Sequence, residues 1–200
     1  MNETTPRADN GIGSVSVLCG SNLGRAPNFS NAAKNLGSVL AASGIRLIYG
    51  GVKTGLMGLL ADSVLERGGQ VIGVIPQFLV SEGISHDGLT ELRIVESMSD
   101  RKMVMLDMSD ATIVLPGGIG TQDEFWEVLA ARQLGFHSKP IGIVNVDGYY
   151  DSLILFVDRA IQEGFISTED RRYLFVSEDP EQLIHDLSES VGPGFKGLVG

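Results

Sequence analysis

The chain has 200 residues, 43% of them hydrophobic and 20% charged, a composition that indicates a single globular domain rather than a disordered chain. The formal net charge of −10 argues against a nucleic-acid-binding surface, which should be basic. No apolar run approaches a membrane span, one cysteine (Cys19) allows no intramolecular disulfide, and the three histidines share no metal-site spacing. We therefore expect a soluble, cytoplasmic protein without a metal.

Residues 1–13 are polar and lack the apolar core of a signal peptide, so we expect them to form a disordered lead. We expect residues 14–191 to form one domain and residues 192–200 to form a flexible tail. Short apolar runs predict strands at residues 14–18, 46–49, 71–75, 91–95, 111–115 and 141–144. Helices are predicted at residues 29–42, 55–68, 101–108, 125–134, 150–163 and 181–191. The segment 77–90 is irregular and polar, and it is a candidate flap.

Strands and helices alternate along the chain, and most of the strands are continuous apolar runs. This pattern predicts an α/β fold of the Rossmann-like, doubly wound kind, with a mainly parallel sheet flanked by helices on both faces. In such folds ligands bind beyond the carboxyl ends of the strands. Glycine-rich turns follow three predicted strands, at Gly20, at Gly50–Gly51 and at Gly117–Gly118. Their common position predicts a binding site at that edge of the sheet.

The stretch from Pro116 to Glu124 reads PGGIGTQDE and separates an apolar strand from a helix-like segment. Its three glycines allow a sharp turn and leave backbone N–H groups uncovered. A strand, a glycine-rich turn and a helix N-terminus together form an anion site, because free amides and the helix dipole point the same way. The stretch lacks the Gly-Lys-Ser/Thr of a Walker loop, and Asp123 stands where the dinucleotide fingerprint needs a third glycine.

Thr121 and Glu124 also have the spacing of a helix capping box. In that interpretation Thr121 caps the helix and the Glu124 side chain binds back to the amide of the capping residue. A structural cap and a ligand site are both compatible with the sequence at this point.

Arg101 and Lys102 form a second stretch of interest. If Ser99 caps the helix at 101–108, both cations occupy its first turn, where each opposes the helix dipole at a cost of up to about 1 kcal/mol. Two solvated surface cations, compensated by Asp100, are the plain alternative. We favour a ligand role, because the pair would hold a phosphate from a second direction and arginine offers a planar fork that matches phosphate.

The motifs at residues 116–124 and 98–102 resemble those of the Lonely Guy family, the cytokinin riboside 5′-monophosphate phosphoribohydrolases. Residues 116–124 match the family motif PGGxGTxxE, and Met98-x-x-Arg101-Lys102 matches a second motif. Other landmarks of the family occur in the same order: Cys19-Gly20-Ser21, Tyr49-Gly50-Gly51, Gly55-Leu56-Met57-Gly58, Ile72-Gly73-Val74-Ile75-Pro76 and Gln133-Leu134-Gly135-x-His137-x-Lys139-Pro140. The similarity covers residues 14–166.

The resemblance implies a homodimer that hydrolyses the N-glycosidic bond of a nucleoside 5′-monophosphate, giving a free base and ribose 5-phosphate. It implies Arg101 and Glu124 as the catalytic pair, and leaves open whether Arg101 mainly holds the phosphate or assists the leaving base. It also implies a set of substrate- and phosphate-binding residues: Cys19, Gly20, Ser21, Gly50, Gly51, Met98, Lys102, Gly117, Gly118, Gly120 and Thr121. No cofactor is expected, since a pyridoxal phosphate site would need a Schiff-base lysine with supporting partners.

Three positions depart from the family pattern. Val52 stands where a third glycine often follows Tyr-Gly-Gly, Ser99 stands where a histidine often follows the methionine, and Asp123 replaces the first of two glutamates. The catalytic pair is kept, so these departures concern substrate preference. We expect an adenine-type base, and the flap residues Phe78 to Val80 could line an apolar pocket for a prenyl group.

Two other functions are alternatives on the same scaffold. A non-catalytic carrier on the same scaffold, similar to molybdenum-cofactor carrier proteins, would keep the glycine-rich turns but would need neither Arg101 nor Glu124. An NAD-dependent oxidoreductase is disfavoured because the dinucleotide fingerprint is incomplete.

Overall fold

The structure is a computed structural model that describes residues 11–191. The lead predicted for residues 1–10 and the tail predicted for residues 192–200 lie outside the described residues. The prediction of a disordered lead was wrong for residues 11–13. Ile12 is fully buried in the core, and the Gly13 amide donates to the Asp110 carboxylate at 2.9 Å. A single apolar residue has no periodicity of its own, so the sequence pattern did not reveal this anchor.

Seven parallel strands form one sheet in the described part of the chain, in the order β4-β3-β2-β1-β5-β6-β7. The strands are β1 (Ser14–Leu18), β2 (Arg46–Tyr49), β3 (Val71–Pro76), β4 (Glu91–Val95), β5 (Ala111–Val114), β6 (Ile141–Val144) and β7 (Leu174–Ser177). The predicted doubly wound, parallel sheet is confirmed.

Helices connect the strands, as a parallel sheet requires. They are α1 (Pro27–Ala42), α2 (Gly55–Leu65), α3 (Gln77–Ser81), α4 (Met98–Met108), α5 (Ile119–Gln133), α6 (Asp151–Gln162), α7 (Thr168–Arg171) and α8 (Pro180–Ser190), with a 3-10 turn η1 (Val146–Gly148) after β6.

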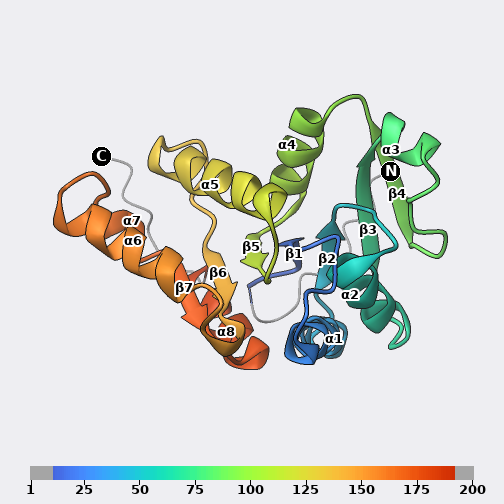
Figure 1. The fold of residues 1–200 in the computed structure, drawn as a ribbon, viewed down its shortest axis with the longest axis horizontal. Helices are drawn as coiled ribbons and strands as arrows, with labels where there is room; N and C mark the ends of the chain where they lie inside the picture. The colour runs from blue at the N-terminus through green and yellow to red at the C-terminus, as the bar shows by residue number, and fades with distance from the viewer. Residues whose placement is uncertain (1–10, 192–200) are drawn as a thin grey trace.

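The helices form one layer on each face of the sheet. Strand side chains alternate between the faces, so Leu47 and Tyr49 pack in one core and Ile48 packs in the other. The first core is covered by α1, α2 and α8, and the second by α4, α5 and α6. Figure 1 shows α4 and α5 above the sheet and α1 below it. Because both faces are covered, the strands can be apolar throughout, as their sequences indicated.

Besides the turn η1, the structure adds three elements that were not predicted from the sequence. Helix α3 occupies the start of the candidate flap, whereas α7 and β7 lie between α6 and α8. These elements are five, four and four residues long, too short for a periodicity to stand out. β7 pairs only with β6 at one edge of the sheet, so it is less buried than the central strands.

The strand order reverses between β1 and β5, because the chain runs outward from β1 to β4 and then returns to build β5, β6 and β7 on the other side. Connections from β1 and β5 therefore leave the sheet toward opposite faces, and a crevice opens between them at the carboxyl ends. Two of the three glycine-rich turns, at Gly20 and at Gly117–Gly118, follow these two strands. The topology thus brings together two of the three turns that were predicted to form the binding site.

Candidate functional site

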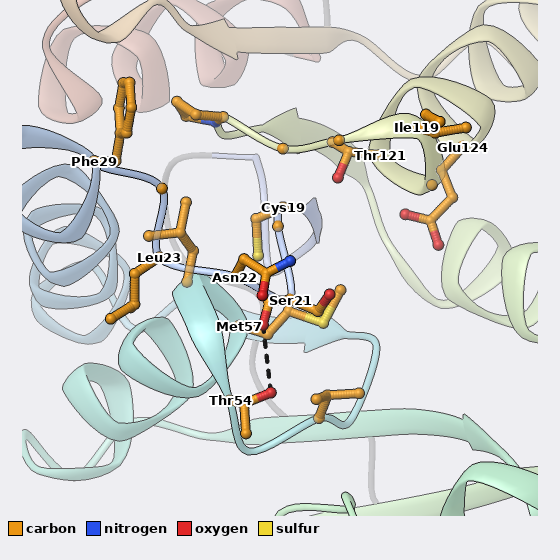
Figure 2. A pocket seen from close by; sticks show the side chains of 18 of the residues that line it. Cys19, Ser21, Asn22, Leu23, Phe29, Thr54, Met57, Ile119, Thr121 and Glu124 are labelled. Carbon is orange, nitrogen blue, oxygen red and sulfur yellow. Dashed lines mark hydrogen bonds between the residues drawn. The ribbon is translucent and has the colours of Figure 1, made fainter. Parts of the chain in front are cut away.

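A pocket of about 770 Å³ lies in the crevice between the turns that follow β1 and β5. In Figure 2, Thr121 and Glu124 reach the pocket from α5, Phe29 and Leu23 lie on the opposite side, and Cys19 lies between them. The volume is within the range of small-molecule sites. The predicted binding edge therefore holds a real cavity.

The glycine turn after β5 is held against the turn after β1. The Gly20 amide donates to the Pro116 carbonyl at 3.0 Å, and a side chain on Gly117 would collide with Thr121 and with the Gly20 amide. By contrast, a Cβ on Gly118 or Gly120 would meet nothing within 4 Å. Glycine at 117 is therefore needed for close packing, whereas the glycines at 118 and 120 leave space open in front of the turn.

Helix α5 begins at Ile119 with Gly118 as its N-cap, six residues before the predicted start. The capping-box interpretation of Thr121 and Glu124 was therefore wrong, since no side chain caps this helix. The N–H groups of Gly118, Ile119, Gly120 and Thr121 precede the first intrahelical hydrogen bond, so they stay available to a ligand. An early helix start places four amides and the positive end of the dipole at the pocket.

Glu124 binds Arg101 instead. The Arg101 Nη2 donates to the Glu124 Oε1 at 2.9 Å, and the two side chains are only 5% and 7% exposed. Burial raises the pKa of Glu124, and the positive charges of Arg101 and Lys102 oppose this shift. A buried ion pair gives little net stability, because desolvation offsets the attraction. Both residues of the pair line the pocket.

Arg101 keeps unused hydrogen-bonding capacity. Its Nε is buried without a partner in the described part of the chain, and its Nη1 makes a long contact of 3.9 Å with the Met98 sulfur. A Cβ on Gly50 would collide with the guanidinium, so glycine at position 50 makes room for Arg101. A buried guanidinium with free donors is suited to an anionic or polar ligand.

Helix α4 positions Arg101 in a different way from the one predicted. Its N-cap is Ser97, not Ser99, and Ser97 and Asp100 form a reciprocal capping box. Arg101 is therefore one residue beyond the first turn rather than at the helix start, and the predicted opposition to the dipole is weaker than expected.

Lys102 does not reach the main pocket. Its Nζ donates to Asp123 at 3.0 Å and pairs with Glu127, and these two carboxylates raise the pKa of Lys102, with the Glu127 hydrogen bond as the largest cause. The lysine instead lines a second cavity of about 340 Å³ between α4 and α5. Of the predicted basic pair, the structure brings only Arg101 to the site.

The other predicted residues divide into two groups. Cys19, Gly20, Ser21 and Met98 line the pocket, as do the glycines and the threonine of the turn after β5. Gly50 and Gly51 are buried behind its wall, where Gly51 has a φ of +71° that favours glycine. Burial raises the pKa of the Cys19 thiol, so this residue forms part of the wall rather than a nucleophile.

Several lining residues were not predicted. Asn22, Leu23 and Phe29 come from the turn after β1 and the first turn of α1, and Tyr149 follows β6. A signal was present for Tyr149, because it lies just beyond the carboxyl end of a predicted parallel strand. From the flap, Leu79 lines the pocket together with Ile84, and Phe78 and Val80 do not.

Residues 11–191 offer neither a metal site nor a membrane-spanning helix. No group of three or more histidine, cysteine, aspartate or glutamate side chains there is arranged to hold a metal ion. No helix among those residues is long and apolar enough to cross a membrane.

Comparison with known proteins places the chain among relatives. A family described as "Possible lysine decarboxylase" matches residues 57–187. The protein named "Probable cytokinin riboside 5′-monophosphate phosphoribohydrolase LOGL9", from Oryza sativa subsp. japonica, is 48% identical over 178 residues, which cover 88% of this chain and 78% of that protein. The Arabidopsis thaliana protein named "Cytokinin riboside 5′-monophosphate phosphoribohydrolase LOG4" is 43% identical over 188 residues, covering 94% and 86%. The chain belongs to the Lonely Guy family.

The two names given to relatives of this Lonely Guy protein imply different chemistry. A pyridoxal phosphate-dependent decarboxylase needs a lysine for its Schiff base. None of the described residues that line the main pocket is a lysine.

Solved structures share the fold of this Lonely Guy protein. The molybdenum cofactor binding protein from Rippkaea orientalis aligns with a TM-score of 0.70 at 21% identity, covering 90% of this chain and 97% of that chain. The molybdenum cofactor carrier protein from Chlamydomonas reinhardtii aligns with a TM-score of 0.64 at 21% identity, covering 88% and 96%. At this identity the likeness concerns the fold alone.

Proposed function

We propose that the protein hydrolyses the N-glycosidic bond of a nucleoside 5′-monophosphate, releasing a free base and ribose 5-phosphate. The observation that carries the proposal is the buried Arg101–Glu124 pair at a pocket that also holds an uncovered helix N-terminus. Curated relatives with 43–48% identity are named phosphoribohydrolases, which supports the same reaction. A nucleotide needs both an anion site and a group that acts on the sugar.

The phosphate is assigned to the amides of Gly118, Ile119, Gly120 and Thr121. These amides precede the hydrogen-bonded part of α5, and the helix dipole adds positive potential at the same place. Anchoring the phosphate fixes the ribose, so binding energy from a remote group serves the bond that breaks.

The ribose then lies near Glu124, whose carboxylate is suited to an oxocarbenium-like transition state. The bond between C1′ and the base nitrogen breaks, and its electron pair leaves with the base. Water adds its hydroxyl to C1′ and gives its remaining proton to Glu124. Glu124 then releases this proton to solvent and the departing nitrogen takes one up from solvent, so one water molecule is consumed and Glu124 is again a carboxylate. Arg101 holds the Glu124 carboxylate in place through the 2.9 Å contact and keeps donors free for the substrate.

The base is assigned to an apolar wall of the pocket that includes Val52, Leu79 and Ile84. Val52 pairs with Ser85 in an isolated antiparallel bridge, which joins this wall to the flap. Val52 is one of the departures from the family pattern, so it is in a position to affect the choice of base.

The test measures release of free base from AMP, from isopentenyladenosine 5′-monophosphate and from adenosine. We expect cleavage of the monophosphates and little cleavage of adenosine, because the nucleoside lacks the anchor at α5. Tight nucleotide binding without cleavage of any monophosphate would contradict the proposal and favour a carrier. Equal kcat/KM values for the two monophosphates would argue against a dedicated prenyl pocket.

The proposal extends to a homodimer in the cytoplasm. Apolar side chains are exposed along α5 and α6: Ile119 is 90% exposed and Phe156 is 60% exposed, and Phe156 contacts Trp126 edge-to-face across the two helices. A second copy that covers this face would remove these side chains from water. Light scattering should give about twice the chain mass of 21.3 kDa, and a monomer at micromolar concentration would contradict the dimer.

A further inference from the structure

Tyr149 contacts the glycine turn from the opposite side to the loop that follows β1. Its hydroxyl donates to the Gly117 carbonyl at 2.7 Å. Tyr149 follows η1 after β6, and the strand order places β6 and β1 on opposite sides of β5. The turn after β5 is therefore held on one side by Tyr149 and on the other by the Gly20 amide, which binds the Pro116 carbonyl.

The carbonyl that Tyr149 binds belongs to the same peptide unit as the Gly118 N–H. In a trans peptide these two groups point in opposite directions. Gly117 and Gly118 are consecutive glycines, for which both orientations of the peptide unit are sterically accessible. A flipped unit would present a carbonyl oxygen, instead of an amide, to an anion at the start of α5. A hydrogen bond to the carbonyl therefore selects the orientation that suits anion binding.

The Tyr149 ring is itself fixed by its neighbours. It packs edge-to-face against Phe29, with ring centroids 5.4 Å apart, and against Tyr150, at 4.9 Å. The backbone that follows Tyr149 is held by Asn145, whose side chain accepts from the Tyr150 amide at 2.8 Å and donates to the Asp151 carboxylate at 2.7 Å. Because the ring and the backbone are both held, the hydroxyl has a defined position relative to the glycine turn.

We propose that Tyr149 is a positioning residue for phosphate recognition: its hydroxyl locks the Gly117–Gly118 peptide so that the Gly118 amide faces the substrate phosphate. The inference rests on the proposed function, in which the amides at the start of α5 hold the phosphate. The ring lines the pocket, but the effect on phosphate is exerted through the peptide and not by direct contact.

The experiment uses Tyr149→Phe in the full chain, which keeps both ring contacts and removes only the hydroxyl. Affinities for ribose 5-phosphate and for adenosine are measured by calorimetry, beside KM and kcat for AMP. We expect ribose 5-phosphate to bind roughly fivefold more weakly, as for loss of one hydrogen bond, with adenosine affinity unchanged. The KM for AMP should rise by a similar factor while kcat changes little, the pattern of lost uniform binding.

Tyr150→Phe is the matched control. The Tyr150 hydroxyl donates to the Leu115 carbonyl at 2.8 Å, accepts from the Gln122 side chain at 3.3 Å and lies beside the Gly117 N–H. The Gly117 carbonyl itself is bound by Tyr149, so Tyr150→Phe leaves the Gly117–Gly118 peptide unit with its hydrogen bond. This variant loses more hydrogen bonds at the same turn than Tyr149→Phe does, yet its relative affinity for ribose 5-phosphate and adenosine should match that of the wild type. Thermal melts check that both variants are folded.

Two results would overturn the inference. One is a Tyr149→Phe protein that binds ribose 5-phosphate as the wild type does. The other is an equal loss of affinity for ribose 5-phosphate and adenosine, which would indicate that Tyr149 only forms part of the pocket wall. Measurements on the wild-type protein test the proposed function separately from the inference about Tyr149. A wild type that neither cleaves AMP nor binds ribose 5-phosphate would overturn the proposed function itself.

Discussion

At the scale of single residues, Arg101 and Glu124 depend on each other for the compensation of their buried charges. Removing one charge from a buried pair leaves its partner buried and unpaired, which is more costly than replacing both. The pair therefore restricts what can be substituted at either position without unfolding the site. Glutamine at position 124 keeps an oxygen that accepts from Arg101, so it separates the loss of the charge from the loss of the contact.

Glu124→Gln should reduce turnover of AMP by roughly 100-fold or more, because the variant cannot stabilise positive charge on the sugar or accept a proton from water. AMP binding should persist, since the phosphate is assigned to backbone amides. Glu127→Gln on the same helix is the control, as Glu127 pairs with Lys102 outside the main pocket. A folded Glu124→Gln protein with near-normal base release would exclude Glu124 as a catalytic residue.

The local sequence around Glu124 indicated a helix cap and did not indicate its contact with Arg101. The spacing of Thr121 and Glu124 fits a cap, yet the helix starts at Ile119 because Gly118 serves as the N-cap. The deciding fact, the contact with Arg101, joins two positions 23 residues apart in the chain. Local spacing cannot reveal such a pair, and it was the family resemblance that selected both residues.

At the scale of elements, the start of α4 determines where Arg101 lies. Both Ser97 and Ser99 are good capping residues, and only the spacing to Asp100 distinguishes them. Asp100 lies three positions after Ser97, and its carboxylate accepts from the Ser97 amide at 3.0 Å. Asp100 is the residue next to Ser99, so it does not have the capping-box spacing to Ser99. The signal for the true cap was therefore present in the sequence, with aspartate in the position where glutamate is more usual.

Ser97→Ala should lower the free energy of unfolding by about 1 kcal/mol, the typical cost of losing an N-cap. Ser99→Ala is the control, since Ser99 is an exposed residue in the first turn and should have little effect. Urea denaturation measures both. Equal destabilisation by the two substitutions would contradict the capping box seen in the structure.

Strand positions were predicted well because buried parallel strands are continuous apolar runs. The exception is β7, whose four residues lie at the sheet edge and have mixed burial. Tyr149 shows the other limit. Its place in the chain is evident, but its contact with Gly117 exists only because β6 lies next to β5, and strand order is not encoded in local patterns.

At the scale of the whole molecule, His137 links stability to pH. Its Nε2 donates to the Val128 carbonyl at 2.9 Å and its Nδ1 accepts from the Lys139 amide, so both nitrogens of the neutral ring are used. Burial lowers the pKa of His137, and the charges of Arg132 and Lys139 add to this shift. The unfolded chain therefore binds this proton more readily than the folded chain, and the stabilisation is lost as the pH falls.

In the His137→Gln variant, the free energy of unfolding should fall less than in the wild type between about pH 7.5 and about pH 5.5, the range in which histidine titrates. The measurement is urea denaturation at both pH values. His185→Gln, at a side chain that is 69% exposed, should follow the wild-type curve. A His137→Gln protein with the full wild-type pH dependence would show that other groups account for it.

Cys19 lies at the wall of the pocket with 1% of its surface exposed, and it is the only cysteine in the sequence. A thiol-specific reagent can reach the sulfur only when the turns after β1 and β5 separate, because thiolate formation and access are both suppressed by burial. The rate of labelling therefore reports how often this crevice opens. Bound nucleotide should slow the labelling, so the protein carries its own probe of pocket dynamics at a single atom.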